Sequence, residues 1–119
     1  MTVFDPSTLH QLVDDVHDRP FVLELVATFR RMLAQRVDRV VAAVNGADPD
    51  EAMDAVLSLK VSSTMTGASE LAEAATCIEA SLRTYDLPRA RSSALLLPAA
   101  AERAGAAIDS YLSRSASPA

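Results

Sequence analysis

Hydrophobic residues recur every three or four positions along almost the whole of this 119-residue chain. That spacing gathers them on one side of an α-helix. No stretch alternates hydrophobic and polar residues cleanly enough to predict a β-strand. Alanine is abundant, and it both favours helices and lets them approach one another closely. The pattern therefore predicts an all-α protein.

The spacing predicts five helical stretches, each with one row of residues that faces the core. These predicted core residues are Leu9, Leu12, Val13 and Val16 in the first stretch, Phe21, Leu25, Phe29, Leu33, Val37, Val40 and Val44 in the second, Ala52, Val56, Leu59 and Ser63 in the third, Leu71, Ala75, Ile78 and Leu82 in the fourth, and Leu97, Ala101, Ala104, Ile108 and Leu112 in the fifth. Because short loops between long helices make neighbours antiparallel, we expect an up-and-down four-helix bundle. The short first helix is expected to cap one end.

Aspartate–proline pairs mark where two of the helices begin. Asp5 precedes Pro6, and Asp48 precedes Pro49. An aspartate caps the free N–H groups of a first turn, and a proline is tolerated there because its missing N–H would have no partner. Pro98 is different, because it lies inside the last predicted helix, which we expect it to kink or split.

Length and charge narrow the class of protein. A chain of 119 residues forms one domain. We expect the bundle over residues 1–113 and a flexible tail over residues 114–119, which are small or polar. The net charge of −5 argues against nucleic acid as the main partner, because phosphate binding needs a basic surface.

Nothing in the sequence predicts a membrane segment or an export signal. The longest hydrophobic run, residues 94–101, contains a proline and is far shorter than the roughly 20 residues that span a bilayer. No Lys or Arg precedes Arg19, so no signal peptide is expected. The single cysteine, Cys77, is expected to be a small packed thiol in the fourth helix. Since it cannot form an internal disulfide, it fits a reducing compartment, and we expect a cytoplasmic protein.

One segment carries a recognisable motif. Residues 56–68 have the sequence V-L-S-L-K-V-S-S-T-M-T-G-A, which resembles the signature A-H-x-L-K-G-S-S-x-x-x-G-A of histidine-containing phosphotransfer (HPt) domains. The matching residues are Leu59, Lys60, Ser62, Ser63, Gly67 and Ala68. With the order and lengths of the predicted helices, the resemblance covers roughly Phe4 to Leu112. It implies a helical bundle of the two-component phosphorelay type, whose partners are response-regulator receiver domains or histidine kinases. It implies no cofactor and no metal.

The sequence departs from the signature where the family does its chemistry. Leu57 stands at the phosphohistidine position, and Val61 stands at the glycine position that leaves room beside the imidazole. A leucine has no lone pair to attack an aspartyl phosphate and no proton to exchange near neutral pH. We therefore expect family-type phosphotransfer to be absent and the chain not to be an enzyme.

Other residues are poor replacements for the missing imidazole. Ser58 is adjacent in sequence, but a serine phosphate is a stable ester that does not suit a reversible relay. His10, Asp14 and His17 share one face of the first helix at a spacing that metal ligands also use. A solvated face is the simpler interpretation of that cluster.

Two basic features have alternative interpretations. Lys60 matches the lysine that steadies the phosphoryl group in the family, so it either pairs with an acidic pocket on a receiver domain or is simply solvated. A basic stretch on the second helix is either a solvated face with i,i+4 ion pairs or an electrostatic rim for an acidic partner. It consists of Arg30, Arg31, Arg36 and Arg39.

The third helix is expected to present a binding face. This face is formed by Met53, Leu57, Lys60, Val61 and Thr64, opposite the core row. Hydrophobic side chains on an outward face usually mark an interaction site. The alternative is local shielding, in which Met53 or a neighbouring helix covers Leu57 and Val61.

Three functions remain open on the sequence alone. The first is a degenerate HPt domain that binds a receiver domain or a second copy of itself without carrying phosphate. The second is a working phosphotransfer protein in which this chain carries a substitution at Leu57. The third is a helical bundle with an unrelated structural role.

Overall fold

The computed structural model describes residues 2–46 and 48–116. Over this part of the chain it contains six α-helices and no strand. The helices are α1 (Pro6–Val16), α2 (Arg19–Asn45), α3 (Pro49–Thr66), α4 (Ser69–Arg83), α5 (Leu87–Ala94) and α6 (Leu97–Ala116). The predicted all-α class is confirmed.

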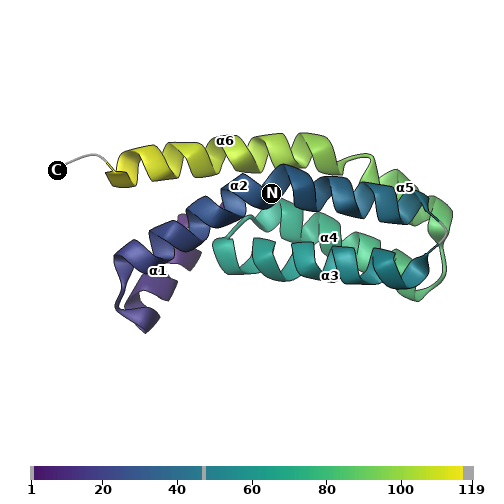
Figure 1. Cartoon of the computed structure of the whole chain (residues 1–119), viewed down its shortest axis with the longest axis horizontal. Coiled ribbons are helices and arrows are strands. Elements are labelled where there is room, and N and C mark those ends of the chain that lie inside the picture. Colours follow the sequence, from purple (N-terminus) through teal and green to yellow (C-terminus); the bar gives the residue numbers. More distant parts are fainter. Residues whose placement is uncertain (1, 47, 117–119) are drawn as a thin grey trace.

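The four long helices form the bundle. α3 packs against both α2 and α4, and α6 closes the bundle against α2 and α4 (Figure 1). α1 packs on α2 and α3 at one end, and α5 packs on α4 and α2 at the other. The expected four-helix bundle with a short N-terminal capping helix is therefore confirmed.

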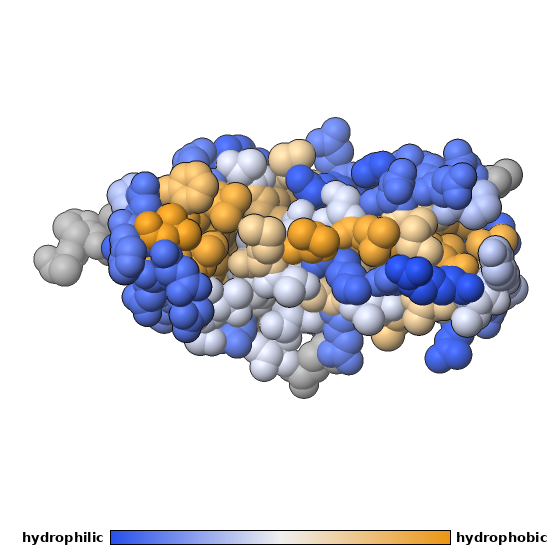
Figure 2. Space-filling model, turned by 90° about the horizontal axis from the view of Figure 1, so that it is seen from below, coloured by the Kyte–Doolittle hydropathy of each residue, from blue (hydrophilic) through white to orange (hydrophobic). Residues whose placement is uncertain are grey.

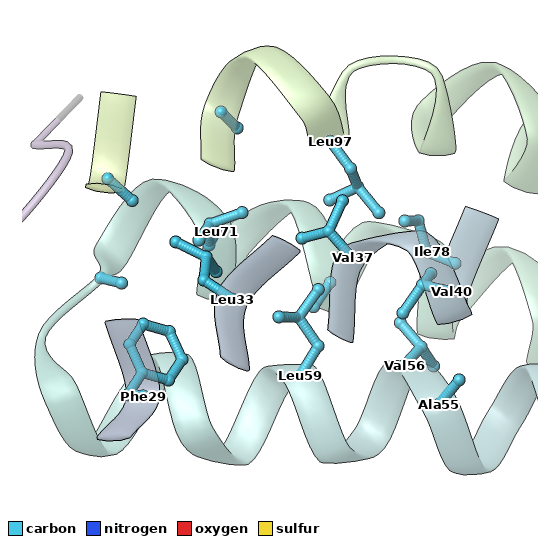
Figure 3. Packing of buried hydrophobic residues seen from close by; sticks show 14 of the residues in the cluster. Phe29, Leu33, Val37, Val40, Ala55, Val56, Leu59, Leu71, Ile78 and Leu97 are labelled. Carbon is cyan, nitrogen blue, oxygen red and sulfur yellow. The ribbon is translucent and has the colours of Figure 1, made fainter. Parts of the chain in front are cut away.

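All four long helices contribute to a single core. Leu33 of α2, Leu59 of α3, Leu71 and Ile78 of α4 and Leu97 of α6 are almost completely buried and point toward one another (Figure 3). The predicted core rows of α3 and α4 are buried throughout. Because both rows are satisfied inside the bundle, the opposite side of α3 is left to face outward.

The predicted core face was wrong at the N-terminal end of α2. Phe21 is 54% exposed and Leu25 is only half-buried, whereas Val22 and Val26 are completely buried. A step of four residues turns about 40° beyond one full turn of an α-helix. Two such steps back from Phe29 therefore rotate the row about 80° away from the core.

The prolines behave as expected at the helix starts. The side chains of Asp5 and Asp48 accept hydrogen bonds from backbone N–H groups of the first turns of α1 and α3. Pro98 lies in the first turn of α6, and the last predicted helix is indeed split into α5 and α6. Leu95 and Leu96 connect the two parts and are strongly exposed.

The C-terminal boundary lies further along than predicted. α6 continues to Ala116, so residues 114–116 of the expected tail are helical. Residues 117–119 of that tail lie outside the described residues. Within the described chain, every helix is too short or too polar to cross a membrane.

Phe29 offers a direct test of the core. Its side chain is 5% exposed and packs between α2 and α3. We expect Phe29→Ala to lower the free energy of unfolding by about 3–5 kcal/mol, because it removes buried surface and leaves a cavity. Denaturant unfolding followed by circular dichroism measures this. A loss below about 1 kcal/mol would show that the side chain is not part of the core.

Candidate functional site

The motif residues lie on α3 and on the turn that follows it. Gly67 ends α3 in the left-handed conformation, with φ of 79°. Its carbonyl oxygen accepts a 2.8 Å hydrogen bond from the N–H of Asp5, and a Cβ here would lie 2.5 Å from the Asp5 carbonyl oxygen. Ala68, the next residue, is fully buried. The glycine and alanine of the motif are therefore explained by backbone packing against the N-terminal segment.

One row of hydrophobic residues runs along the outward side of α3. We call it the α3 ridge, and it consists of Met53, Leu57, Val61 and Met65, at intervals of four residues. Val61 is 56% exposed and Met65 is 49% exposed, while Met53 and Leu57 are half-buried. Figure 2 shows the face on which α3 lies, with a band of hydrophobic residues along its length between hydrophilic ones.

The structure brings most of the predicted face together, with three differences, which concern Met53, Met65 and Lys60. Thr64 is exposed beside the ridge, whereas Met53 packs partly against the core. Met65 was missed by the sequence analysis, although continuing the four-residue spacing by one more turn from Val61 finds it. Lys60 points away from the ridge toward α4.

Lys60 is held by an ion pair that the sequence did not predict. Its ammonium donates a 2.7 Å hydrogen bond to the carboxylate of Glu79 on α4, and Arg83 donates to the other oxygen of that carboxylate. Glu79 is only 8% exposed. Hydrogen bonds from Lys60 and then Arg83 hold the pKa of the Glu79 carboxyl below its ordinary value, although burial opposes the shift. The lysine is thus neither freely solvated nor unpaired.

Arg36 borders the other side of the ridge, next to α2. Its Nη1 donates hydrogen bonds of 2.8 Å to the Ser58 hydroxyl and 3.0 Å to the Ser62 hydroxyl. Its Nε is buried and has no hydrogen-bond partner within the described structure. The guanidinium therefore joins α2 to α3 through hydroxyl groups, without a carboxylate in contact among the ion pairs of the described residues.

The other arginines of the basic stretch have acidic partners. Arg30 pairs with Asp109 of α6, and Arg39 pairs with Glu51 of α3. Arg31 pairs with Glu24, seven residues earlier on α2. The expected i,i+4 pairing within α2 was therefore wrong, because two of the three pairs connect helices and the third spans two turns. Of the four arginines in this stretch, Arg36 is the one that still fits the alternative interpretation, an electrostatic rim for an acidic partner.

A shallow groove of about 100 Å³ lies between α2 and α3, beside the ridge. Its lining is mostly apolar and consists of Leu25, Thr28, Phe29, Met32, Arg36, Ser62, Met65 and Thr66. Two of these residues carry thioethers, which adapt easily to the shape of a partner. The groove widens the hydrophobic surface of the ridge toward α2.

The remaining candidate residues lie away from the ridge. His10 and His17 are exposed on and just after α1, and no group of three His, Cys, Asp or Glu side chains within the described residues is arranged to bind a metal. Cys77 is exposed, so the expectation of a packed thiol was wrong. Its position on α4 lies one residue before the buried Ile78, and a step of one residue turns the side chain about 100° away from the core.

The Glu79 ion pairs generate a pH prediction. Because the pKa of Glu79 is lower in the folded state than in the unfolded state, its ionised form stabilises the fold above the ordinary value of 4.5. This contribution is lost as the pH falls below that value and through the folded-state pKa. We expect Glu79→Gln to lower the melting temperature at neutral pH and to have a shrinking effect in acid. Glu73→Gln, at an exposed position of the same helix, is the matched control. An equal effect of Glu79→Gln at all pH values would contradict the assignment.

Comparison with known proteins agrees with this geometry. The model of the Hpt domain family matches residues 24–114, which include α3, the ridge and both of its flanks. Neither the curated proteins nor the solved structures contain a match to this chain. Hpt domains are phosphotransfer carriers of two-component phosphorelays, and they interact with receiver domains and histidine kinases. Since the match covers most of the chain, this protein belongs to the Hpt domain family.

Proposed function

We propose that this chain is a degenerate Hpt domain that binds proteins without transferring phosphate. In this proposal the α3 ridge docks the receiver domain of a response regulator. The observation that carries it is the hydrophobic row at the place where the motif puts the phosphohistidine, with Leu57 at that position and Val61 one turn further. The domain would then keep the docking surface of its family and lack its nucleophile.

The chemistry of the ridge supports the loss of phosphotransfer. A relay needs an exposed nitrogen nucleophile that accepts a phosphoryl group from an aspartate and later returns it. Leucine offers none, and both histidines of the chain lie outside α3. The hydroxyls of Ser58 and Ser62 already accept hydrogen bonds from Arg36. Lys60, at the position of the family lysine, forms an ion pair with Glu79.

The composition of the surface supports docking. Exposed hydrophobic surface costs about 25 cal/mol per Å² in water, and burial against a partner recovers that cost. The α3 ridge is apolar, and polar groups border it on both flanks. Arg36 and its serines lie beside the apolar groove on the α2 side, and Lys60 with Glu79 lies on the α4 side. A hydrophobic centre with a polar rim is the usual arrangement of a protein–protein interface.

A phosphorylation experiment tests the loss of chemistry. The purified chain is incubated with a phosphorylated receiver domain, and acid-labile phosphate on the chain is measured. We expect none, because there is no imidazole at position 57. Phosphate on the unaltered chain would overturn the proposal. Leu57→His is the companion variant: if it gains phosphate with Val61 and the Lys60–Glu79 pair still in place, the histidine alone was lost and the second function, a substituted phosphotransfer protein, is favoured.

A charge placed on the ridge tests docking. We expect Val61→Asp to weaken binding of a receiver domain by about tenfold or more, because the new carboxylate would be buried unpaired at the interface. The fold should be spared, since Val61 is already more than half exposed. Isothermal titration calorimetry measures binding, and a thermal melt checks the fold.

Leu95→Asp is the control for this experiment. It likewise replaces a hydrophobic side chain by a carboxylate, at a residue that is 76% exposed in the connection between α5 and α6. It should leave receiver binding unchanged. Equal effects of Val61→Asp and Leu95→Asp would contradict docking through the ridge. If the unaltered chain binds no receiver domain at all, the unrelated structural role is favoured.

A further inference from the structure

We infer that the α3 ridge also binds a second copy of this chain, with the two α3 helices antiparallel and Leu57 on the two-fold axis. The inference rests on the proposed function only in taking the ridge as a docking surface. It is supported by the pattern of hydrophobic and charged residues on α3 and on the neighbouring side of α2. When a second copy is placed antiparallel to the first, hydrophobic residues meet hydrophobic residues and acidic residues meet basic ones.

The hydrophobic row fits this arrangement. A two-fold axis at Leu57, perpendicular to α3, places position 57 + n of one copy opposite position 57 − n of the other. Val61 of one copy then lies opposite Met53 of the other, and Leu57 lies opposite its own copy. The middle of the ridge thus meets only hydrophobic side chains of the other copy.

The charges on the α2 side fit the same axis. Asp54, Ser58 and Ser62 form the neighbouring row, also at intervals of four residues. Asp54 is exposed and lies close enough to Arg39 of α2 to influence it electrostatically, so this row borders α2. Arg39, however, already has a carboxylate partner in Glu51.

Measured along α3, Asp54 and Arg36 lie at about equal distances on the two sides of the axis. Asp54 lies three positions before Leu57, about 4.5 Å along the helix. Arg36 donates to Ser58 and Ser62, whose midpoint lies three positions after Leu57. A two-fold axis perpendicular to α3 keeps the α2 sides of the two copies on the same side. Asp54 of each copy therefore faces Arg36 of the other, and the interface contains this ion pair twice.

This arrangement supplies what Arg36 lacks within one chain. Its guanidinium is partly buried beside an apolar groove, with hydroxyl partners and an unpaired Nε. A carboxylate from a second copy would compensate that charge.

The two-fold axis also gives a reason for a leucine at position 57. A side chain on a two-fold axis meets its own copy, so leucine packs well there, whereas two charged imidazoles would repel each other.

Exchanging the charges tests the inference. The unaltered protein should show a concentration-dependent monomer–dimer equilibrium in sedimentation velocity over about a hundredfold range of concentration. Arg36→Asp and Asp54→Arg should each raise the dissociation constant by about tenfold or more, because each creates two like-charge pairs. An equimolar mixture of the two variants should recover dimers, because two ion pairs form in the heterodimer, one with the original polarity and one with the polarity reversed.

The controls separate this inference from simple destabilisation. Circular dichroism establishes that each variant is folded. Asp38→Arg makes the same charge change as Asp54→Arg but lies in the groove between α2 and α6, so it should leave the dimer unchanged. If Arg36→Asp does not fold, Leu57→Asp tests the axis itself: it should abolish the dimer by opposing two carboxylates, while Leu57→Met preserves it.

The outcomes also separate this inference from the proposed function. A chain that stays monomeric over the whole concentration range overturns the second-copy inference, and so does a mixture of the two folded variants that stays monomeric. Receiver binding by such a monomer leaves the proposed function standing. A dimer with the expected charge-swap behaviour and no affinity for receiver domains supports the inference and overturns receiver docking.

Discussion

The burial of one row of α3 determines the outward surface of this protein. Val56, Leu59 and Ser63 are completely buried where α3 packs between α2 and α4. Because an α-helix turns 100° per residue, this burial fixes the direction of every other side chain on the helix. The row through Leu57 and Val61 can then only face outward or toward the flanks. The candidate site is therefore a direct consequence of how α3 is packed.

The polar contacts on both sides of the α3 ridge hold that helix in its orientation. Arg36 connects it to α2 through two serines, and Lys60 connects it to α4 through the nearly buried Glu79. Each contact leaves a buried or half-buried charge if it is broken, which costs more than breaking a solvated pair. In the family the lysine is expected to steady a phosphoryl group. Here the same residue contributes to the packing of α3 on α4, which is consistent with a domain that carries no phosphate.

Sequence reasoning predicted the helices well and the contacts between residues of different helices less well. The core rows of α3 and α4 followed from the spacing of hydrophobic residues, because those rows keep the mean helical period over their whole length. The row of α2 drifted at Phe21, because a strict four-residue step departs from that period. The motif glycine, Gly67, was matched by position only. Its reason, the close approach of the Asp5 backbone, involves residues far apart in sequence, and no local pattern reveals it.

The ion pairs show the same limit more clearly. Lys60 and Glu79 are 19 residues apart, and Arg30 and Asp109 are 79 apart. Helical spacing tells which residues share a face, but it does not tell which face of another helix lies opposite. Arg36 is the instructive case, because its neighbours in the sequence gave no sign that it alone in its stretch would contact hydroxyls rather than a carboxylate. A charge that the fold leaves without an opposite charge beside a hydrophobic ridge is more informative about binding than the total charge of the chain. An acidic protein can thus present a locally basic edge, and that edge favours an acidic group on whatever molecule covers the ridge.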